Sequence, residues 1–237
     1  MRKILLESNF DADNYCEYLF NNYDIQLKDK TVTEIPIPSK EDIDEMNSTH
    51  WNIMLICGNS GSGKSTILRE LFGGQKKLEY DYKKAVISQF TEWKVEDVCD
   101  LLFSVGLSSV PTWLRKPNEL SNGERARLDL CKSIYDARNG EIVIIDEYTS
   151  VVNRACAKSM SFALQRYARQ KDLKFVIASC HYDIIPWLQP DYVFNMNHVD
   201  GDGNVELEKM IYSDDADYDS NQGVKEEQIL SCEMEIE

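Results

Sequence analysis

The chain of 237 residues has 41 acidic and 26 basic side chains, a net charge of −15, and is 43% apolar. This length suits one full α/β domain with appendages, and no stretch approaches the roughly 20 apolar residues that cross a bilayer. Thirteen of the acids lie in 200–237 beside two lysines, so this tail carries −11 and residues 1–199 carry −4. Such acidity disfavours broad nucleic-acid binding, and it makes the tail either a solvated face or a docking segment for a basic partner.

The seven cysteines are scattered and include no C-x-x-C pair, so the sequence predicts neither a zinc site nor a disulfide framework. Residues 1–18 contain a short apolar run and then turn acidic, which fits neither a secretory signal nor a transit peptide. We therefore expect a cytoplasmic protein that spans no membrane.

Strand and helix patterns alternate along most of the chain. Before residue 51 we expect strands at ILLE and TVTEIPIP, a helix over 13–23 and an exposed loop at PSKEDIDEMNST. From residue 51 the predicted series is strand WNIMLIC, helix TILRELF, strand AVIS, two helical stretches, strand IVIID, helix 154–170, and strands FVIAS and YVFNM. After residue 200 we expect a turn at DGDGN between polar strands, a flexible acidic loop at SDDADYDSNQG and a last alternating run, ILSCEMEIE. Strands that alternate with helices predict a mostly parallel sheet covered on both faces.

The strongest motif directly follows the strand WNIMLIC. It fits G-x-x-x-x-G-K-[ST] with Gly58, Asn59, Ser60, Gly61, Ser62, Gly63, Lys64, Ser65 and Thr66. Glycines let successive N–H groups point at phosphates, and the helix that follows adds its positive N-terminal end. Lys64 would reach the β- and γ-phosphates, and the Ser65 hydroxyl would ligate Mg²⁺. The motif predicts a P-loop, which alone does not separate kinases, GTPases, helicases and transporters.

The second motif is a pair of carboxylates, Asp146 and Glu147, at the end of the apolar strand IVIID. Ligands of parallel sheets sit at the carboxyl ends of the strands. Asp146 would hold Mg²⁺ through its water shell, and Glu147 would act on the attacking water as general base.

The third motif, LSNGER over 120–125, opens an amphipathic helix about twenty residues before the Asp-Glu pair. In this order it resembles the signature of ABC-type (ATP-binding cassette) ATPases, usually written L-S-G-G-Q, with Asn122 and Glu124 as departures. The resemblance implies that Ser121 and the Gly123 backbone contact the γ-phosphate of ATP held by the opposite protomer. Asn122 tolerates a left-handed backbone, so it can replace the first glycine of the family motif.

Two further positions match the family, and one segment resembles it. Gln89 resembles the Q-loop glutamine that touches Mg²⁺, and His181, after the strand FVIAS, resembles the switch histidine that supports the γ-phosphate. The segment after Glu147 resembles the D-loop, with Tyr148 in place of Pro and Asn153 in place of Asp. These two departures put the communication between the two sites in doubt.

The resemblance covers about residues 51–200 and implies an α/β P-loop NTPase with antiparallel strand regions at the N- and C-termini. We divide the chain into an N-terminal strand region (1–50), an ATP-binding domain (51–200) with a short helical insert (90–120), and an acidic hairpin or tail (201–237). The implied enzyme is a soluble Mg-dependent ATPase. It would close as a head-to-tail homodimer around ATP and drive or gate a protein or nucleic-acid partner.

Other functions remain open at this point. Only 31 residues separate Gln89 from Ser121, which is short for the helical subdomain of transporter ATPases. A transporter's nucleotide-binding subunit, a slow ATP-operated switch and a P-loop kinase of small molecules are the alternatives. For stacking on adenine the sequence offers Phe20, Tyr23 or Trp51 without choosing among them.

Overall fold

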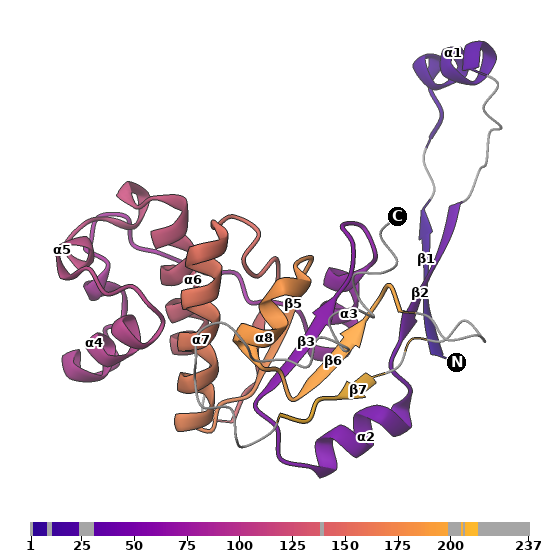
Figure 1. The fold of residues 1–237 in the computed structure, drawn as a ribbon. Helices are drawn as coiled ribbons and strands as arrows, with labels where there is room; N and C mark the ends of the chain where they lie inside the picture. Colours follow the sequence, from indigo (N-terminus) through magenta and orange to yellow (C-terminus); the bar gives the residue numbers. More distant parts are fainter. Residues whose placement is uncertain are drawn as a thin grey trace.

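The computed structural model describes residues 2–8, 11–23, 31–137, 140–198, 205 and 207–212. Its centre is a five-stranded sheet in the order β4-β5-β3-β6-β7 (Figure 1). Neighbouring strands are parallel, except that β7 is antiparallel to β6. This confirms the mostly parallel sheet and the late antiparallel strand. The strands are β3 (Ile53–Cys57), β4 (Val143–Ile145), β5 (Phe175–Ser179), β6 (Tyr192–Asn195) and β7 (Leu207–Lys209).

Helices cover both faces of this sheet. Successive residues of β3 alternate between two apolar cores: Leu55 belongs to one, and Met54 and Ile56 to the other. Because both faces are dry, every residue of β3 and of β5 is buried, which explains their unbroken apolar sequences. The Leu55 core is closed by α4 (Val95–Ser104), α6 (Asn122–Asp136) and α7 (Arg154–Gln170), and the Met54 core by α2 (Lys40–Ser48) and α3 (Lys64–Phe72).

A separate two-stranded hairpin precedes this core. Strands β1 (Arg2–Ser8) and β2 (Thr31–Ile37) pair antiparallel from Arg2↔Ile37 to Ser8↔Thr31. Helix α1 (Asn14–Tyr23) lies between them in sequence, so it sits beyond the Ser8–Thr31 end of the hairpin, as Figure 1 shows. The predicted N-terminal strands and helix are thus confirmed.

The insert between the P-loop half and the signature is short. It contains α4, α5 (Val110–Trp113) and the 3₁₀ turn η2 (Pro117–Glu119), and the 3₁₀ turn η1 (Ile87–Gln89) directly precedes it. The Trp113 indole is buried, donates a 2.7 Å hydrogen bond to the Leu107 carbonyl and packs edge-on against Phe103. One indole therefore organises the loop that leads to Ser121. Two short helical turns complete the fold after β5: η3 (Tyr182–Ile184) and α8 (Ile185–Leu188).

Two of the predicted secondary-structure elements are wrong. The expected loop at 38–49 is helix α2, because Ser39 and Asp42 form a reciprocal capping box that starts a helix, and Met46 anchors it in the core. The expected strand AVIS is loop and 3₁₀ turn, because Val86 donates its N–H to the Arg115 carbonyl instead of joining a sheet.

The predictions for the acidic tail fall outside the described residues, apart from β7. The division of the chain into three regions remains a prediction. Within the part of the chain that the structure describes, no helix combines the length and apolarity needed to span a bilayer.

Candidate nucleotide site

The P-loop connects the buried end of β3 to the start of α3. Gly61 and Gly63 have φ of 81° and 98°, the left-handed region that favours glycine. A Cβ at Gly58 would lie 2.6 Å from the Met196 Cβ, so a side chain there would collide with the loop after β6. Backbone conformation and close packing thus explain why these three motif positions are glycines.

Lys64 is buried inside this loop. Its Nζ donates to the carbonyls of Gly58 (2.8 Å) and Asn59 (2.7 Å), so the ammonium lies within the curve of the loop. The Ser62 hydroxyl is buried and has no hydrogen-bond partner among the described residues. An orphaned donor beside a buried cation is what an incoming phosphate oxygen would satisfy, so the loop fits a phosphate group.

Asp146 and Glu147 directly follow β4. The Asp146 N–H donates to Gln75 Oε1 at 2.9 Å. The Oδ1 of Asp146 accepts from the Glu147 N–H, also at 2.9 Å. Glu147 has φ of 53°, and its Oε2 accepts a 2.6 Å hydrogen bond from the Ser150 hydroxyl. A non-glycine residue in this left-handed region is strained, and such strain collects at functional sites.

His181 follows β5 and faces the same loop. Its Nδ1 lies 3.1 Å from the Thr149 Oγ1, and its backbone N–H donates to the Ser179 hydroxyl, which itself donates to the Tyr148 carbonyl. Burial lowers the pKa of His181, and the nearby Arg154 charge lowers it further. The imidazole is therefore neutral at pH 7.

The sheet order brings these motifs to one edge. Strand β5 lies between β3 and β4, with Cys57 level with Ser179 and Ile145 level with Ile177. The P-loop, the His181 turn and the carboxylate pair therefore leave three adjacent parallel strands at their carboxyl ends. This is the edge where α/β sheets bind ligands.

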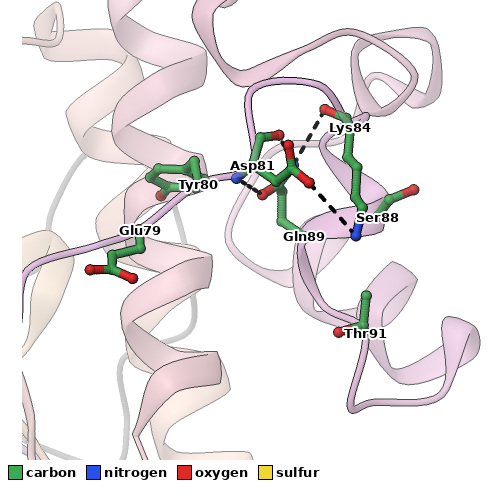
Figure 2. A pocket seen from close by; sticks show the side chains of 7 residues that line it. All are labelled: Glu79, Tyr80, Asp81, Lys84, Ser88, Gln89 and Thr91. Atoms are coloured by element: carbon green, nitrogen blue, oxygen red, sulfur yellow. Dashed lines mark hydrogen bonds and ion pairs between the residues drawn. The ribbon is translucent and has the colours of Figure 1, made fainter.

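The hydrogen bonds that the structure describes for the Gln89 side chain all stay within its own loop, and none reaches this edge of the sheet. Its Oε1 accepts from the Asp81 N–H, and its Nε2 donates to the carbonyls of Asp81, Lys84 and Ala85 at 2.9–3.3 Å. Figure 2 shows the amide turned into its own loop, in a shallow depression of about 340 Å³. The contact of Gln89 with Mg²⁺ stays a prediction, and it requires the amide to leave these partners.

The loop that holds Gln89 is tied to the signature helix. The Tyr80 hydroxyl donates to Asp129 Oδ1 at 2.8 Å, and the Arg125 guanidinium both bonds the same oxygen and stacks 4.2 Å from the Tyr80 ring. Burial raises the pKa of Tyr80, with the Asp129 charge as the second cause. Tyr80 thus joins the segment before Gln89 to α6 by one hydrogen bond and one cation–π contact.

The signature residues lie in a different pocket. Ser121 is the N-cap of α6, and Glu124 closes a capping box by accepting from both the N–H and the hydroxyl of Ser121 at 2.8 Å. The departure at Glu124 therefore has a local structural reason. Asn122 sits in the first helical turn with negative φ, so the expected tolerance for a left-handed backbone is not needed there.

This pocket has a volume of about 400 Å³ and joins the starts of two helices. Asn153, one of the D-loop departures, caps α7 by accepting from the Cys156 N–H at 2.8 Å, a role that Asp also fills. Tyr148, the other departure, is buried with its hydroxyl 3.2 Å from Ser161 Oγ. The pocket, with no P-loop residue in its lining, is lined by Ser121, Asn122, Gly123, Glu124, Arg127, Val151, Val152, Asn153 and Cys156.

Sequence reasoning missed Gln75 and Thr149. Gln75 accepts from the Asp146 N–H and lies outside every motif, whereas Thr149 lies in the D-loop segment, but its contact with the His181 ring was not predicted. Among the three adenine candidates, Trp51 is 1% exposed and has Lys174 over its ring, so it offers no open face to a base.

No family model matches the sequence, and the search of curated proteins gives no match. Solved structures do match. The ATP-binding cassette MJ0796, in a dimeric post-hydrolysis state bound to ADP and Pi, gives a TM-score of 0.53 at 12% identity, over 79% of this chain and 95% of that chain. An ABC transporter in an inward-facing conformation gives 0.50 at 16% identity, over 67% of this chain and 72% of that chain. The chain therefore has the fold of an ABC-type ATP-binding cassette, as the motifs predicted.

Proposed function

We propose that this protein is a cytoplasmic ATPase that binds Mg·ATP and hydrolyses it between two copies of itself arranged head to tail. The observation that carries the proposal is the separation of the motifs into two surfaces. The P-loop, carboxylates and His181 leave adjacent strands at one edge, while Ser121 and Gly123 line a pocket with no P-loop residue. Two such half-sites complete each other when copies face one another.

On the P-loop half, the chain's own groups bind and orient the triphosphate. The P-loop amides and the Ser62 hydroxyl would donate to phosphate oxygens, and Lys64 would exchange its two carbonyl partners for the β- and γ-phosphates. The oxygen donors Ser65 and Asp146, with Gln89 once released, would hold Mg²⁺, which supplies charge neutralisation at the phosphates when bound. Each of these side chains is an oxygen ligand of the kind that Mg²⁺ prefers.

Glu147 would take a proton from the attacking water. The Ser150 hydroxyl fixes one carboxylate oxygen at 2.6 Å and leaves the other for water. His181 is neutral and has its Nδ1 beside Thr149, so its Nε2 is the nitrogen free to face the γ-phosphate. In-line attack then needs only positioning and charge stabilisation, the two effects that account for most of the catalysis of phosphoryl transfer.

On the signature half, the partner's Ser121 and Gly123 would close the site from the opposite side. The start of the 15-residue helix α6 presents unpaired N–H groups and a positive helix end, which suit a γ-phosphate. A nucleotide-binding subunit of a transporter is the second candidate, because one matching fold belongs to an ABC transporter. A slow ATP-operated switch would use the same residues.

The test is phosphate release from ATP combined with light scattering. Wild type should release phosphate only with Mg²⁺, and Glu147→Gln should accumulate as a dimer only when Mg·ATP is present. A Glu147→Gln protein that binds ATP and stays a monomer at all concentrations would overturn the dimeric site. Phosphate release by the wild type, without such a dimer, would leave a partner-completed ATPase such as the transporter subunit.

A further inference from the structure

Thr149 is a strained residue in the loop that joins β4 to α7. Its φ is 66°, in the left-handed region, where a β-branched side chain is a rare outlier, and only 4% of the residue is exposed. Strain of this kind persists only where neighbouring contacts fix the backbone, and it collects at functional sites. The strain at Thr149 therefore points to a contact that its side chain makes.

Two hydrogen bonds to strand β5 hold this loop in place. The Tyr148 N–H donates to the Ala178 carbonyl, and the Tyr148 carbonyl accepts from the Ser179 hydroxyl, each at 2.9 Å. The same hydroxyl accepts from the His181 N–H at 3.1 Å. Ser179 is buried and thus joins the backbones of the two loops. These contacts fix Thr149 beside the His181 ring, with its Oγ1 3.1 Å from Nδ1.

The burial of Thr149 determines the direction of this hydrogen bond. A buried hydroxyl proton needs an acceptor, and among the described residues the one hydrogen-bond partner of Oγ1 is Nδ1 of His181. If Nδ1 carried a proton, the hydroxyl would accept it, and the hydroxyl's own proton would be left without a partner, which is unfavourable. The Thr149 hydroxyl therefore donates, and Nδ1 carries no proton.

With Nδ1 unprotonated, the neutral ring has its proton on Nε2. Burial lowers the pKa of His181 and the Arg154 charge lowers it further, so the neutral form predominates at pH 7. Within the part of the chain that the structure describes, Nε2 has no hydrogen-bond partner. A phosphate oxygen is an acceptor, so a neutral histidine can bind it only through the nitrogen that bears hydrogen. The tautomer set by Thr149 is the one that such an oxygen requires.

We propose that Thr149 is a positioning residue for ATP hydrolysis, whose hydroxyl holds His181 as the Nε2–H tautomer that donates to the γ-phosphate. The inference rests on the proposed function, because that function brings a γ-phosphate to His181. In this role Thr149 acts through the ring and does not itself contact the phosphate. The role also gives a reason for the strained φ of Thr149, since that backbone conformation places the hydroxyl at Nδ1.

The first experiment determines the tautomer in the absence of nucleotide. The chain has three histidines, so labelled histidine gives few signals in nitrogen NMR, and His181→Gln identifies the signals of His181 by their loss. Above pH 7, Nδ1 should be unprotonated and Nε2 protonated in the wild type and in Thr149→Ser, which keeps the hydroxyl. Thr149→Val keeps the shape of the side chain and removes the donor, so the ring should populate both tautomers.

The second experiment measures steady-state phosphate release in Mg·ATP. Thr149→Val should lower kcat about 10–100-fold, the range typical of groups that orient a metal-binding histidine, with the KM for ATP near that of the wild type. Thr149→Ser should restore most of kcat. Thr49→Val is the matched control, because it also removes a hydroxyl, one that lies 2.7 Å from the Tyr192 hydroxyl and outside the site. The control should change neither kcat nor the His181 tautomer.

The outcomes separate two failures. If the wild type releases no phosphate with Mg·ATP, the proposed function fails, and the role of Thr149 in hydrolysis fails with it. If the wild type is active, but Nδ1 carries the proton or Thr149→Val matches Thr49→Val in kcat, the proposed function stands and Thr149 has no positioning role. A Thr149→Ser protein as impaired as Thr149→Val would also overturn the proposal, because the hydroxyl would then not explain the loss.

Discussion

The P-loop edge and the signature pocket differ in how complete each is as a phosphate site. At the P-loop edge, a buried cation, an orphaned hydroxyl and two carboxylates lie within a few residues of adjacent strand ends. The signature pocket has the starts of two helices, a capped Ser121 and one cation in its lining, Arg127, which donates to the Cys156 sulfur. We therefore expect the first half to bind the nucleotide and the second to complete the site of another copy. Nucleotide binding and hydrolysis should therefore be separable by mutation.

The largest effect is expected from loss of Lys64, the P-loop residue expected to bind the phosphates. Lys64→Ala removes the buried ammonium, so ATP binding should be lost and kcat/KM should fall by about 10³-fold or more. Nucleotide binding by calorimetry and phosphate release check both parts. Lys77→Ala, at an exposed lysine outside the P-loop, is the control. Normal ATP affinity in Lys64→Ala would contradict the assignment of the P-loop half.

Glu147→Gln should separate ATP binding from hydrolysis, because it leaves the P-loop and Lys64 intact and removes the general base. Single-turnover hydrolysis should fall by about 10²–10⁴-fold while ATP affinity stays near that of the wild type. Ser150→Ala, which only frees the carboxylate, should lose far less. Multiple turnover at the wild-type rate in Glu147→Gln would remove Glu147 as the base.

On the signature side, Glu124→Ala should destabilise the start of α6. Loss of the capping box costs about 0.5–2 kcal/mol of unfolding free energy. Glu124→Gln keeps a capping side chain and should cost less. Both are measured by urea denaturation.

The same contact predicts a pH dependence. Hydrogen bonds from Ser121 lower the pKa of Glu124, so its stabilising contribution is present above its ordinary pKa of 4.5 and is lost as pH falls through the lower folded value. A wild type whose stability falls no more steeply in acid than that of Glu124→Ala would contradict this.

The smallest effect is expected at His181. Burial and the Arg154 charge keep its pKa below 6.5, so the neutral imidazole persists at pH 7 and protonates only at lower pH. Arg154→Gln removes a positive charge that lowers the pKa of His181. It also leaves Asp183 without its ion-pair partner, and the Asp183 charge raises this pKa. The acidic limb of the kcat profile should therefore move to higher pH, and an unmoved limb would exclude His181 as the titrating group.

The sequence predicted the parallel sheet and the motif order because both depend on local patterns. Strand β3 and the glycines at 58–63 are examples, since an apolar run and a left-handed turn are visible in composition. Helix α2 was missed because its start rests on the Ser39–Asp42 capping box within a polar stretch. The contacts of Gln75 and of the Gln89 amide involve backbone groups, and no residue pattern predicts them.

A mixing experiment can show whether the site is shared between copies. Lys64→Ala cannot bind ATP at its P-loop, and Ser121→Arg blocks the signature half with a large side chain. Each variant alone should therefore be inactive. Mixed in equal amounts, they should recover about a quarter of wild-type phosphate release, because half of the dimers contain one intact composite site. No recovery at any ratio, although the two variants form mixed dimers, would contradict a site completed in trans.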